Sequence, residues 1–227
     1  MQKIFIEAHS KVKISLPGGE ISKLPKRIGL FTTVQHIREM PKVREELEKN
    51  GKIVLTGKGK RTAYPGQVLG CDAYGAERIS GEVDAFLYIG SGKFHPIGIA
   101  LSGKKPVFCF DPFSKRFEKL DEKEVEKVIK KKKGALVKFL SSNEIGLLVS
   151  IKPGQSIIRN AILAKGKIEK LGKRCYILLF DTLDFSELDN FPFIECFVNM
   201  ACPRISEDYL LMKKPVAEYN EISAYLK

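Results

Sequence analysis

The sequence has no long hydrophobic run, and this absence excludes a helix that crosses a membrane. Its longest nearly apolar stretch, Ile145–Ile151, is far shorter than the roughly 20 residues that a bilayer requires. The first residues, Met1–Phe5, also lack the apolar run and small-residue cleavage site of a signal peptide. We therefore expect a cytoplasmic protein that does not interact with membranes.

Cysteine is present in odd number, without an export signal, which argues against a secreted disulfide scaffold. Each thiol must then be core filler, a metal ligand or a nucleophile. The five cysteines are Cys71, Cys109, Cys175, Cys196 and Cys202.

Positive charge is in excess, with 39 Lys and Arg against 27 Asp and Glu, a formal net charge of +12. Such an excess suits an acidic partner such as RNA, or a lysine-rich solvated surface. No aromatic RNA-binding motif accompanies the charge, so we expect a solvated surface and no specific nucleic acid partner. The 227 residues, 44% of them hydrophobic, are enough for one large or two modest domains.

An internal repeat organises the chain. A short apolar strand, a helix ended by Gly51 and further strands are predicted over residues 27–33, 35–49, 52–56, 83–90 and 105–110. The last strand is predicted at a sheet edge because Pro106 opens it. The pattern then restarts over residues 144–150, 156–171, 174–180 and 193–200. Apolar strands that alternate with helices predict an α/β fold of two consecutive similar domains, each a small parallel sheet flanked by helices.

The predicted domains are residues 18–120, which carry Cys71, and 143–227, which carry Cys202. Residues 121–142 form a charged connecting helix whose lysine run is either a solvated face or a phosphate-binding one. Residues 1–17 contain two strand-like patterns, Ile4–Ala8 and Val12–Ile14, without a helix between them. We interpret residues 1–17 as the remaining strands of an earlier unit that is missing.

Polar and reactive residues follow the predicted strands, where ligands bind in open parallel sheets. In the first domain these segments contain Gln35, His36 and His95; in the second they are Ser150–Gln155 and Ala201–Arg204. Each alone is compatible with a turn, a helix cap or a packed histidine. Their occurrence at the same sheet edge in both domains is stronger evidence for a ligand-binding site than any one of them.

The cysteines separate by position. Three lie inside apolar strands and are predicted to be core residues, whereas Cys71 lies in the glycine-flanked loop Pro65–Asp72 and Cys202 precedes Pro203. A proline in the first helical position would put Cys202 at a helix N-terminus, where the backbone dipole favours a thiolate. These two thiols are candidates for shared metal ligation, but two thiolates do not complete the usual zinc or iron–sulfur site.

Four segments resemble the signatures of the archaeal and eukaryotic diphthamide synthase family, the 2-(3-amino-3-carboxypropyl)histidine synthases. They are YPGQVLGC (64–71), GSGKFHP (90–96), SIKPGQ (150–155) and ACPR (201–204), and Thr32–His36 and Lys11–Ile14 also fit. The resemblance covers essentially the whole chain. It implies three similar α/β domains, each of which gives one cysteine to a [4Fe–4S] cluster, and an enzyme that cleaves S-adenosylmethionine. The resulting 3-amino-3-carboxypropyl radical adds to C2 of a histidine on translation elongation factor 2.

The resemblance also implies roles for residues of this chain. Cluster ligation falls to Cys71 and Cys202, and catalytic roles fall to His95 and Arg204. Cofactor binding is implied for Gln35, Lys152, Gly154 and Gln155.

The sequence departs from the family pattern because no cysteine precedes Cys71. We therefore expect a second polypeptide to supply the missing domain and the third ligand. Two alternatives stay open: a non-catalytic companion subunit of a complete synthase, and a basic RNA-binding module.

Overall fold

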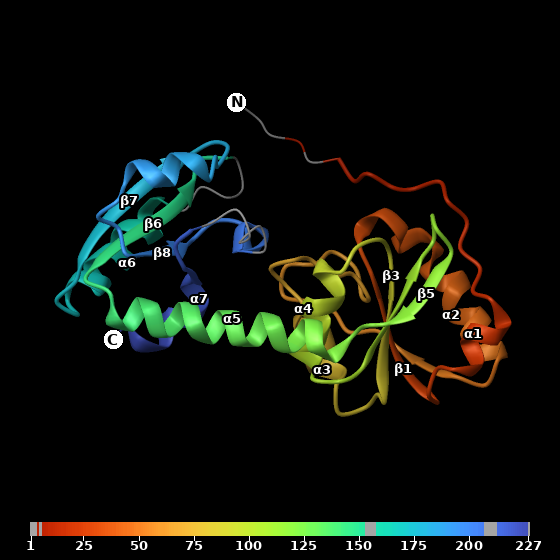
Figure 1. Ribbon diagram of the computed structural model, residues 1–227. Coiled ribbons are helices and arrows are strands. Elements are labelled where there is room, and N and C mark those ends of the chain that lie inside the picture. The colour runs from red at the N-terminus through yellow and green to blue at the C-terminus, as the bar shows by residue number, and fades with distance from the viewer. Residues whose placement is uncertain (1–3, 5, 153–157, 207–212, 227) are drawn as a thin grey trace. The chain divides into compact units, whose positions relative to one another are not determined.

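The computed structural model describes residues 4, 6–152, 158–206 and 213–226. The chain divides into two compact units, Met1–Val125 and Glu126–Lys227, and helix α5 (Glu122–Ser141) runs from the first into the second (Figure 1). Within the described ranges, no helix is long and apolar enough to span a membrane.

The first unit is built on a five-stranded sheet in the order β2-β1-β3-β4-β5. Its strands are β1 (Arg27–Thr32), β2 (Ile53–Leu55), β3 (Ala85–Ile89), β4 (Val107–Asp111) and β5 (Arg116–Lys119). The first four are parallel, and β5 pairs antiparallel with β4. The direction in which successive strands are added to the sheet reverses between β1 and β3. In sheets of this kind, ligands bind beyond the carboxyl ends of the two strands at such a reversal.

The prediction that the Pro106 strand lies at a sheet edge is wrong. Strand β5 covers the outer side of β4, with Asp111 opposite Arg116. Pro106 precedes the first residue of β4 and contributes its carbonyl, which accepts the N–H of Phe86 at 2.9 Å. A proline in that position removes no donor from the ladder, so it does not prevent a second neighbour.

Alternation along the strands sends side chains into two separate cores of the first unit. Leu87 and Ile89 of β3 pack with α1 (Gly18–Ser22) and α2 (Met40–Lys49). Phe86 and Tyr88 pack on the opposite face with α3 (Tyr74–Ile79) and α4 (Phe94–Gly103). Helices therefore cover both faces of this sheet, as predicted.

The helix predicted over residues 35–49 is divided into two parts. A 3₁₀ helix, η1 (Val34–Glu39), leads into α2, which begins at Met40 with Pro41 in its first turn. Proline is compatible with the first turn of an α-helix because the N–H groups there have no partner inside the helix. Pro41 therefore marks where the α-helix begins.

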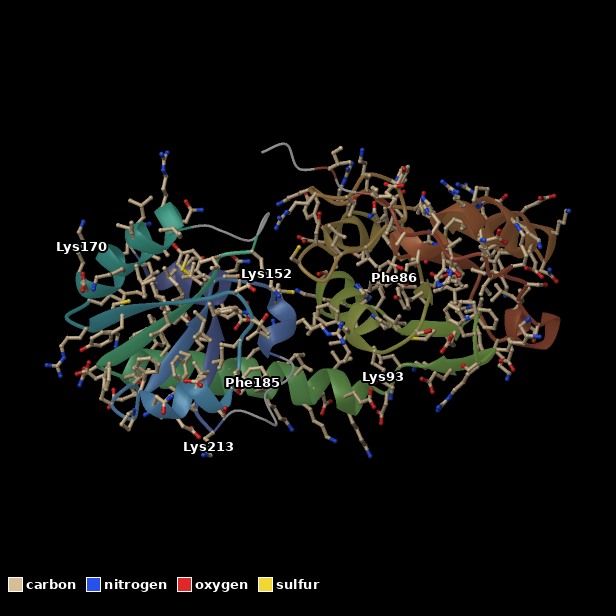
Figure 2. The ribbon with its side chains drawn as sticks, turned by 90° about the horizontal axis from the view of Figure 1, so that it is seen from above. Phe86, Lys93, Lys152, Lys170, Phe185 and Lys213 are labelled. Carbon is tan, nitrogen blue, oxygen red and sulfur yellow. The ribbon has the colours of Figure 1, made fainter. Side chains whose placement is uncertain are left out.

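Phe86 occupies the centre of the first unit because two glycines leave space for its ring (labelled in Figure 2). A Cβ on Gly29 would lie 2.5 Å from this ring, and a Cβ on Gly103 would lie 2.2 Å from it. The ring is completely buried. These close approaches fix the distance of α4 from the sheet, and with it the position of the first turn of α4.

The described residues among 4–17 form no strand, so the strand predictions over Ile4–Ala8 and Val12–Ile14 are wrong where the structure describes them. Ile14 and Leu16, two residues apart, do insert into the core. However, their N–H groups donate to the carboxylates of Glu39 and Glu46, at 3.3 and 3.1 Å. The segment thus uses helix side chains in place of a neighbouring strand.

The second unit contains a four-stranded parallel sheet in the order β7-β6-β8-β9. Its strands are β6 (Glu144–Ser150), β7 (Arg174–Phe180), β8 (Cys196–Asn199) and β9 (Val216–Glu218). The order β7-β6-β8 matches β2-β1-β3 of the first unit, so both units share the same topology. Strand β9 was not predicted, because its three residues are too few to show a period.

Helices and turns cover both faces of this second sheet. Among the described residues, its helical elements include α5, α6 (Ile158–Glu169), η2 (Ser186–Asn190), η3 (Pro203–Ser206), α7 (Tyr219–Ile222) and η5 (Ser223–Tyr225). Phe139 of α5 and Ala161 of α6 pack in one core with β6, and Leu188 of η2 packs against Phe197 in the other. The α/β class predicted from the sequence is therefore confirmed.

Candidate functional site

Cys71 lies at the tip of a tight turn in the first unit. Leu69 and Asp72 pair as an isolated antiparallel bridge, with N···O distances of 3.1 and 3.0 Å, and leave Gly70 and Cys71 at the tip. The thiol is exposed, and Nη1 of Arg61 lies 3.6 Å from its Sγ. The turn therefore presents a sulfur atom to solvent beside a positive charge.

Two buried polar side chains hold the backbone of this loop. Gln67 Oε1 accepts the N–H groups of Ala63 and Tyr64 at 2.8 and 3.1 Å. Asp72 accepts the N–H groups of Arg61 and Tyr74 at 2.5 and 3.1 Å. Sequence reasoning assigned no role to Gln67 or Asp72, although a polar residue at each end of the segment Val68–Cys71 was the available signal.

The structure brings His95 close to the Cys71 turn. A Cβ on Gly70 would lie 2.1 Å from the ring of Phe94, so the turn rests directly on the first residue of α4. The ring of His95 contacts that of Phe94 at a centroid distance of 5.1 Å and stacks on Tyr88 at 5.9 Å. Cys71 and His95 thus belong to one locality at the carboxyl end of β3.

The remaining first-unit candidate, Gln35, lies on η1 immediately after β1, with its side chain exposed. Its carbonyl accepts the N–H of Ser10 at 2.8 Å. The neighbouring Thr32 pairs with Gln67 in an isolated parallel bridge, which places the Cys71 loop beside the end of β1. Gln35 therefore lies at the same sheet edge as that loop, as predicted.

The charged side chains around the turn from β3 to α4 already form ion pairs or hydrogen bonds within the protein. Nζ of Lys93 (labelled in Figure 2) lies 2.6 Å from Glu124, and this hydrogen bond raises the pKa of Lys93. Ser91 donates to Asp111 at 2.9 Å, and the backbone N–H of Phe113 donates to the same carboxylate. We therefore assign Lys93 and Asp111 to the support of the turn and not to a ligand.

In the second unit, Cys202 follows β8 in a turn that Asn199 builds. The amide nitrogen of Asn199 donates to the carbonyl of Cys202 at 2.9 Å and to Glu218 at 3.0 Å, while its oxygen accepts the N–H of Ala201 at 2.9 Å. Asn199 is 1% exposed, and Cys202 is half-buried. An asparagine at the end of an apolar strand was the sequence signal for this role, and sequence reasoning missed it.

Cys202 directly precedes a helix that has Pro203 in its first position, as predicted, but the described part of this helix is a single 3₁₀ turn. Pro203 begins the four-residue 3₁₀ helix η3. A single turn of this kind does not align enough peptide dipoles to act as a helix macrodipole. Arg204 lies on this turn with its side chain exposed.

Lys152 lies two residues beyond β6, at the carboxyl edge of the second sheet, and its side chain is exposed. Its N–H donates to Oγ of Ser150 at 3.1 Å. The predicted cofactor-binding residues Gly154 and Gln155 lie outside the described residues.

The other three cysteines are buried, as the sequence predicted. Burial is the largest cause that raises the pKa of Cys109, Cys175 and Cys196, in each case to about 12. A thiol with such a pKa stays protonated near neutral pH and is a poor metal ligand. Cys71 and Cys202 are therefore the two cysteines on turns that solvent reaches.

These two thiols fit part of an iron–sulfur site. Such clusters are held by cysteine thiolates, and both turns end in a sulfur atom that core packing does not enclose. Within residues 4, 6–152, 158–206 and 213–226, no group of three His, Cys, Asp or Glu side chains could hold a metal ion. Each unit thus presents one solvent-accessible thiol of the kind that ligates such a cluster.

His36, also singled out at the sheet edge, is a packed residue. It is 2% exposed and lies against Phe113, with ring centroids 5.7 Å apart. Burial lowers its pKa below 6.5 and outweighs the opposite effects of Asp111 and Glu39. The structure therefore favours the packed-histidine interpretation of the two that the sequence left open.

The lowered pKa of His36 predicts a loss of stability in mild acid. The unfolded chain binds a proton near pH 6.5 while the folded chain does not, so the free energy of unfolding falls as the pH drops from 7.5 to 5.5. Urea unfolding at both pH values should show this fall, and the His36→Phe variant should show a smaller one. Equal falls in the two proteins would contradict the prediction.

The whole chain, residues 1–227, matches the family of the diphthamide synthesis protein. It is 36% identical to the 2-(3-amino-3-carboxypropyl)histidine synthase of Pyrococcus horikoshii, over 98% of this chain and 65% of that protein. It is 24% identical to subunit 1 of the human synthase, over 80% of this chain and 40% of that subunit.

Solved structures agree with the sequence matches. The structure resembles that of Dph2 from Pyrococcus horikoshii with a 4Fe-4S cluster, with a TM-score of 0.77 and 35% identity over 92% of this chain and 59% of that one. The chain thus spans less than two thirds of the length of these relatives. Fold, topology and sequence agree, and the chain belongs to the diphthamide synthesis protein family.

Proposed function

We propose that this chain is a subunit or shortened form of diphthamide synthase that uses a [4Fe–4S] cluster. It transfers the 3-amino-3-carboxypropyl group of S-adenosylmethionine to a histidine of translation elongation factor 2. The observation that carries the proposal is the position of Cys71 and Cys202 on accessible turns at the ends of the two sheets. A 4Fe-4S cluster in the Pyrococcus horikoshii relative supports it.

The net reaction exchanges one hydrogen on C2 of the histidine imidazole for the 3-amino-3-carboxypropyl group. The bond from sulfur to the methionine γ-carbon breaks, a carbon–carbon bond forms, and methylthioadenosine and a proton are released. When bound, the cluster would supply the electron that starts this cleavage. The thiolates of Cys71 and Cys202 would hold it, and Arg61 would donate a hydrogen bond to the Cys71 sulfur, as its 3.6 Å approach allows.

The other residues bind and orient the substrates. Arg204 has the planar guanidinium that pairs with a carboxylate through two hydrogen bonds, and it lies two residues after Cys202. Lys152, with Gly154 and Gln155, would bind the same anionic part of S-adenosylmethionine from the end of β6, and Gln35 would bind the cofactor from the first unit. His95, next to the Cys71 turn, would contact the reacting histidine.

A second polypeptide completes the site in this proposal. Cys71 and Cys202 would provide two ligands, and the described residues contain no group of three His, Cys, Asp or Glu that could hold a metal ion. Some relatives are themselves named as subunits of the synthase, among them human subunit 1. The partner would contribute one α/β unit with a loop cysteine.

The test is anaerobic reconstitution with iron and sulfide, followed by addition of a reductant, S-adenosylmethionine and elongation factor 2. We expect methylthioadenosine release and a gain of one 3-amino-3-carboxypropyl group on the factor when a partner chain with one loop cysteine is coexpressed. The chain alone should give at least about tenfold less product, because its cluster lacks a ligand. A cluster that forms without any transfer in the assembled pair would favour the non-catalytic companion role.

A further inference from the structure

Tyr88 is a buried phenol that the proposed mechanism does not use. It is the fourth of the five residues of β3, is 1% exposed, and lies at the point where the strand approaches the site. Burial, followed by the charges of Cys109 and Asp111, raises the pKa of this phenol. Tyr88 therefore keeps its proton over the whole range in which an enzyme works.

The hydroxyl of Tyr88 faces one particular atom of His95. The distance from the phenol oxygen to Nδ1 is 3.3 Å, and the two rings stack with an interplanar angle of 21°. A phenol that keeps its proton can donate it to Nδ1. A neutral imidazole that accepts at Nδ1 carries its own proton on Nε2.

The backbone around this pair is shaped to preserve the contact. A Cβ on Gly90 would lie 2.6 Å from the Tyr88 hydroxyl oxygen, and Gly90 has a φ of 150°, which side chains rarely adopt. The His95 ring also contacts the ring of Phe94 at an interplanar angle of 63°. Gly90 leaves the space that the hydroxyl occupies, and Phe94 restricts rotation of the imidazole.

We propose that Tyr88 is a positioning residue for His95: its hydroxyl donates to Nδ1 and keeps the imidazole as the Nε2–H tautomer. In this tautomer the ring proton lies on Nε2, and a carboxylate oxygen or an imidazole nitrogen can accept a hydrogen bond from it. This inference rests on the proposed function only for the substrate that His95 contacts. The hydrogen bond and the tautomer are properties of the free chain.

The tautomer can be measured directly by ¹⁵N NMR of the imidazole nitrogens in the full chain. The sequence has three histidines, and a His95→Asn variant assigns the signals of His95. We expect the wild-type chain to show the Nε2–H tautomer of His95 at a pH where the ring is neutral. A predominant Nδ1–H tautomer would overturn the proposal without any variant at Tyr88.

The Tyr88→Phe variant keeps the stacked ring and removes only the hydroxyl. It should shift the ratio of the two His95 tautomers by roughly two- to tenfold, as expected for one net hydrogen bond. Tyr64→Phe is the matched control, because the hydroxyl of Tyr64 bonds to Glu7 and not to a histidine of the site. An unchanged His95 signal in Tyr88→Phe would refute the role. Should that variant unfold, Gly90→Ala displaces the same hydroxyl and should shift the same signal.

Activity separates this inference from the proposed function. In an active assembly, Tyr88→Phe should lower kcat with little change in KM for S-adenosylmethionine, and should have little further effect when His95 is already asparagine. A shifted tautomer in a chain that shows no transfer with any partner would support the hydrogen bond and contradict the proposed function. An unshifted tautomer in an active enzyme would support the proposed function and contradict the role of Tyr88.

Discussion

Replacing either Cys71 or Cys202 by alanine is expected to abolish cluster assembly in the reconstituted complex. Both thiols lie on turns outside the packed cores, and an iron–sulfur cluster that loses one of its cysteines loses most of its affinity. Iron content and charge-transfer absorption should fall by about tenfold or more in each variant. Neither substitution removes a core side chain, so the free energy of unfolding of the apo-chain should change little.

Cys109→Ala and Cys196→Ala are the matched controls for this experiment. Their thiols are buried in β4 and β8, and burial raises the pKa of both to about 12. They should therefore retain full iron content, while they lose stability by about 1 kcal/mol for the apolar volume that is removed. Full iron binding by both Cys71→Ala and Cys202→Ala would show that the ligand assignment is wrong.

Replacing Gly57 by alanine is expected to be the most destabilising single methyl addition in the first unit. A Cβ on Gly57 would lie 1.9 Å from the carbonyl oxygen of Gly75, and a Cβ on Gly75 would lie 2.7 Å from that of Gly57. The obstacle is backbone and not a side chain that can rotate away, so the loss should reach the upper part of the range for overpacking, about 3 kcal/mol. Urea unfolding measures it.

Gly81→Ala is the control for Gly57→Ala, because nothing lies within 4 Å of a Cβ at that position. Its urea midpoint should stay close to that of the wild-type chain. The loop that presents Cys71 begins and ends near the Gly57–Gly75 contact, so Gly57→Ala should also weaken iron binding. If Gly57→Ala unfolds at the wild-type urea concentration, the close approach of these two backbones is not real.

The sequence determined the class of fold and the edge of each sheet at which the candidate site residues lie. Strands and helices are recognised from the hydrophobic pattern of residues that are close in the chain. The strands β6 and β7 therefore begin and end where predicted. The same local signal placed three cysteines in the core, and the structure confirms that they are buried. Local periodicity cannot distinguish a strand from an extended segment, which is why residues near Ile14 were assigned wrongly.

Only the tertiary structure decided how the site is held. The contact of Gly70 with Phe94, the stacking of Tyr88 on His95 and the hydrogen bonds of Asn199 join segments whose spacing along the chain follows no period. Such contacts depend on how strands and helices pack, because a buried polar group takes whichever partner the completed fold places within reach. Residue types along the chain indicated the chemistry of the site. The packing of the folded chain determined which atoms hold the site residues in position.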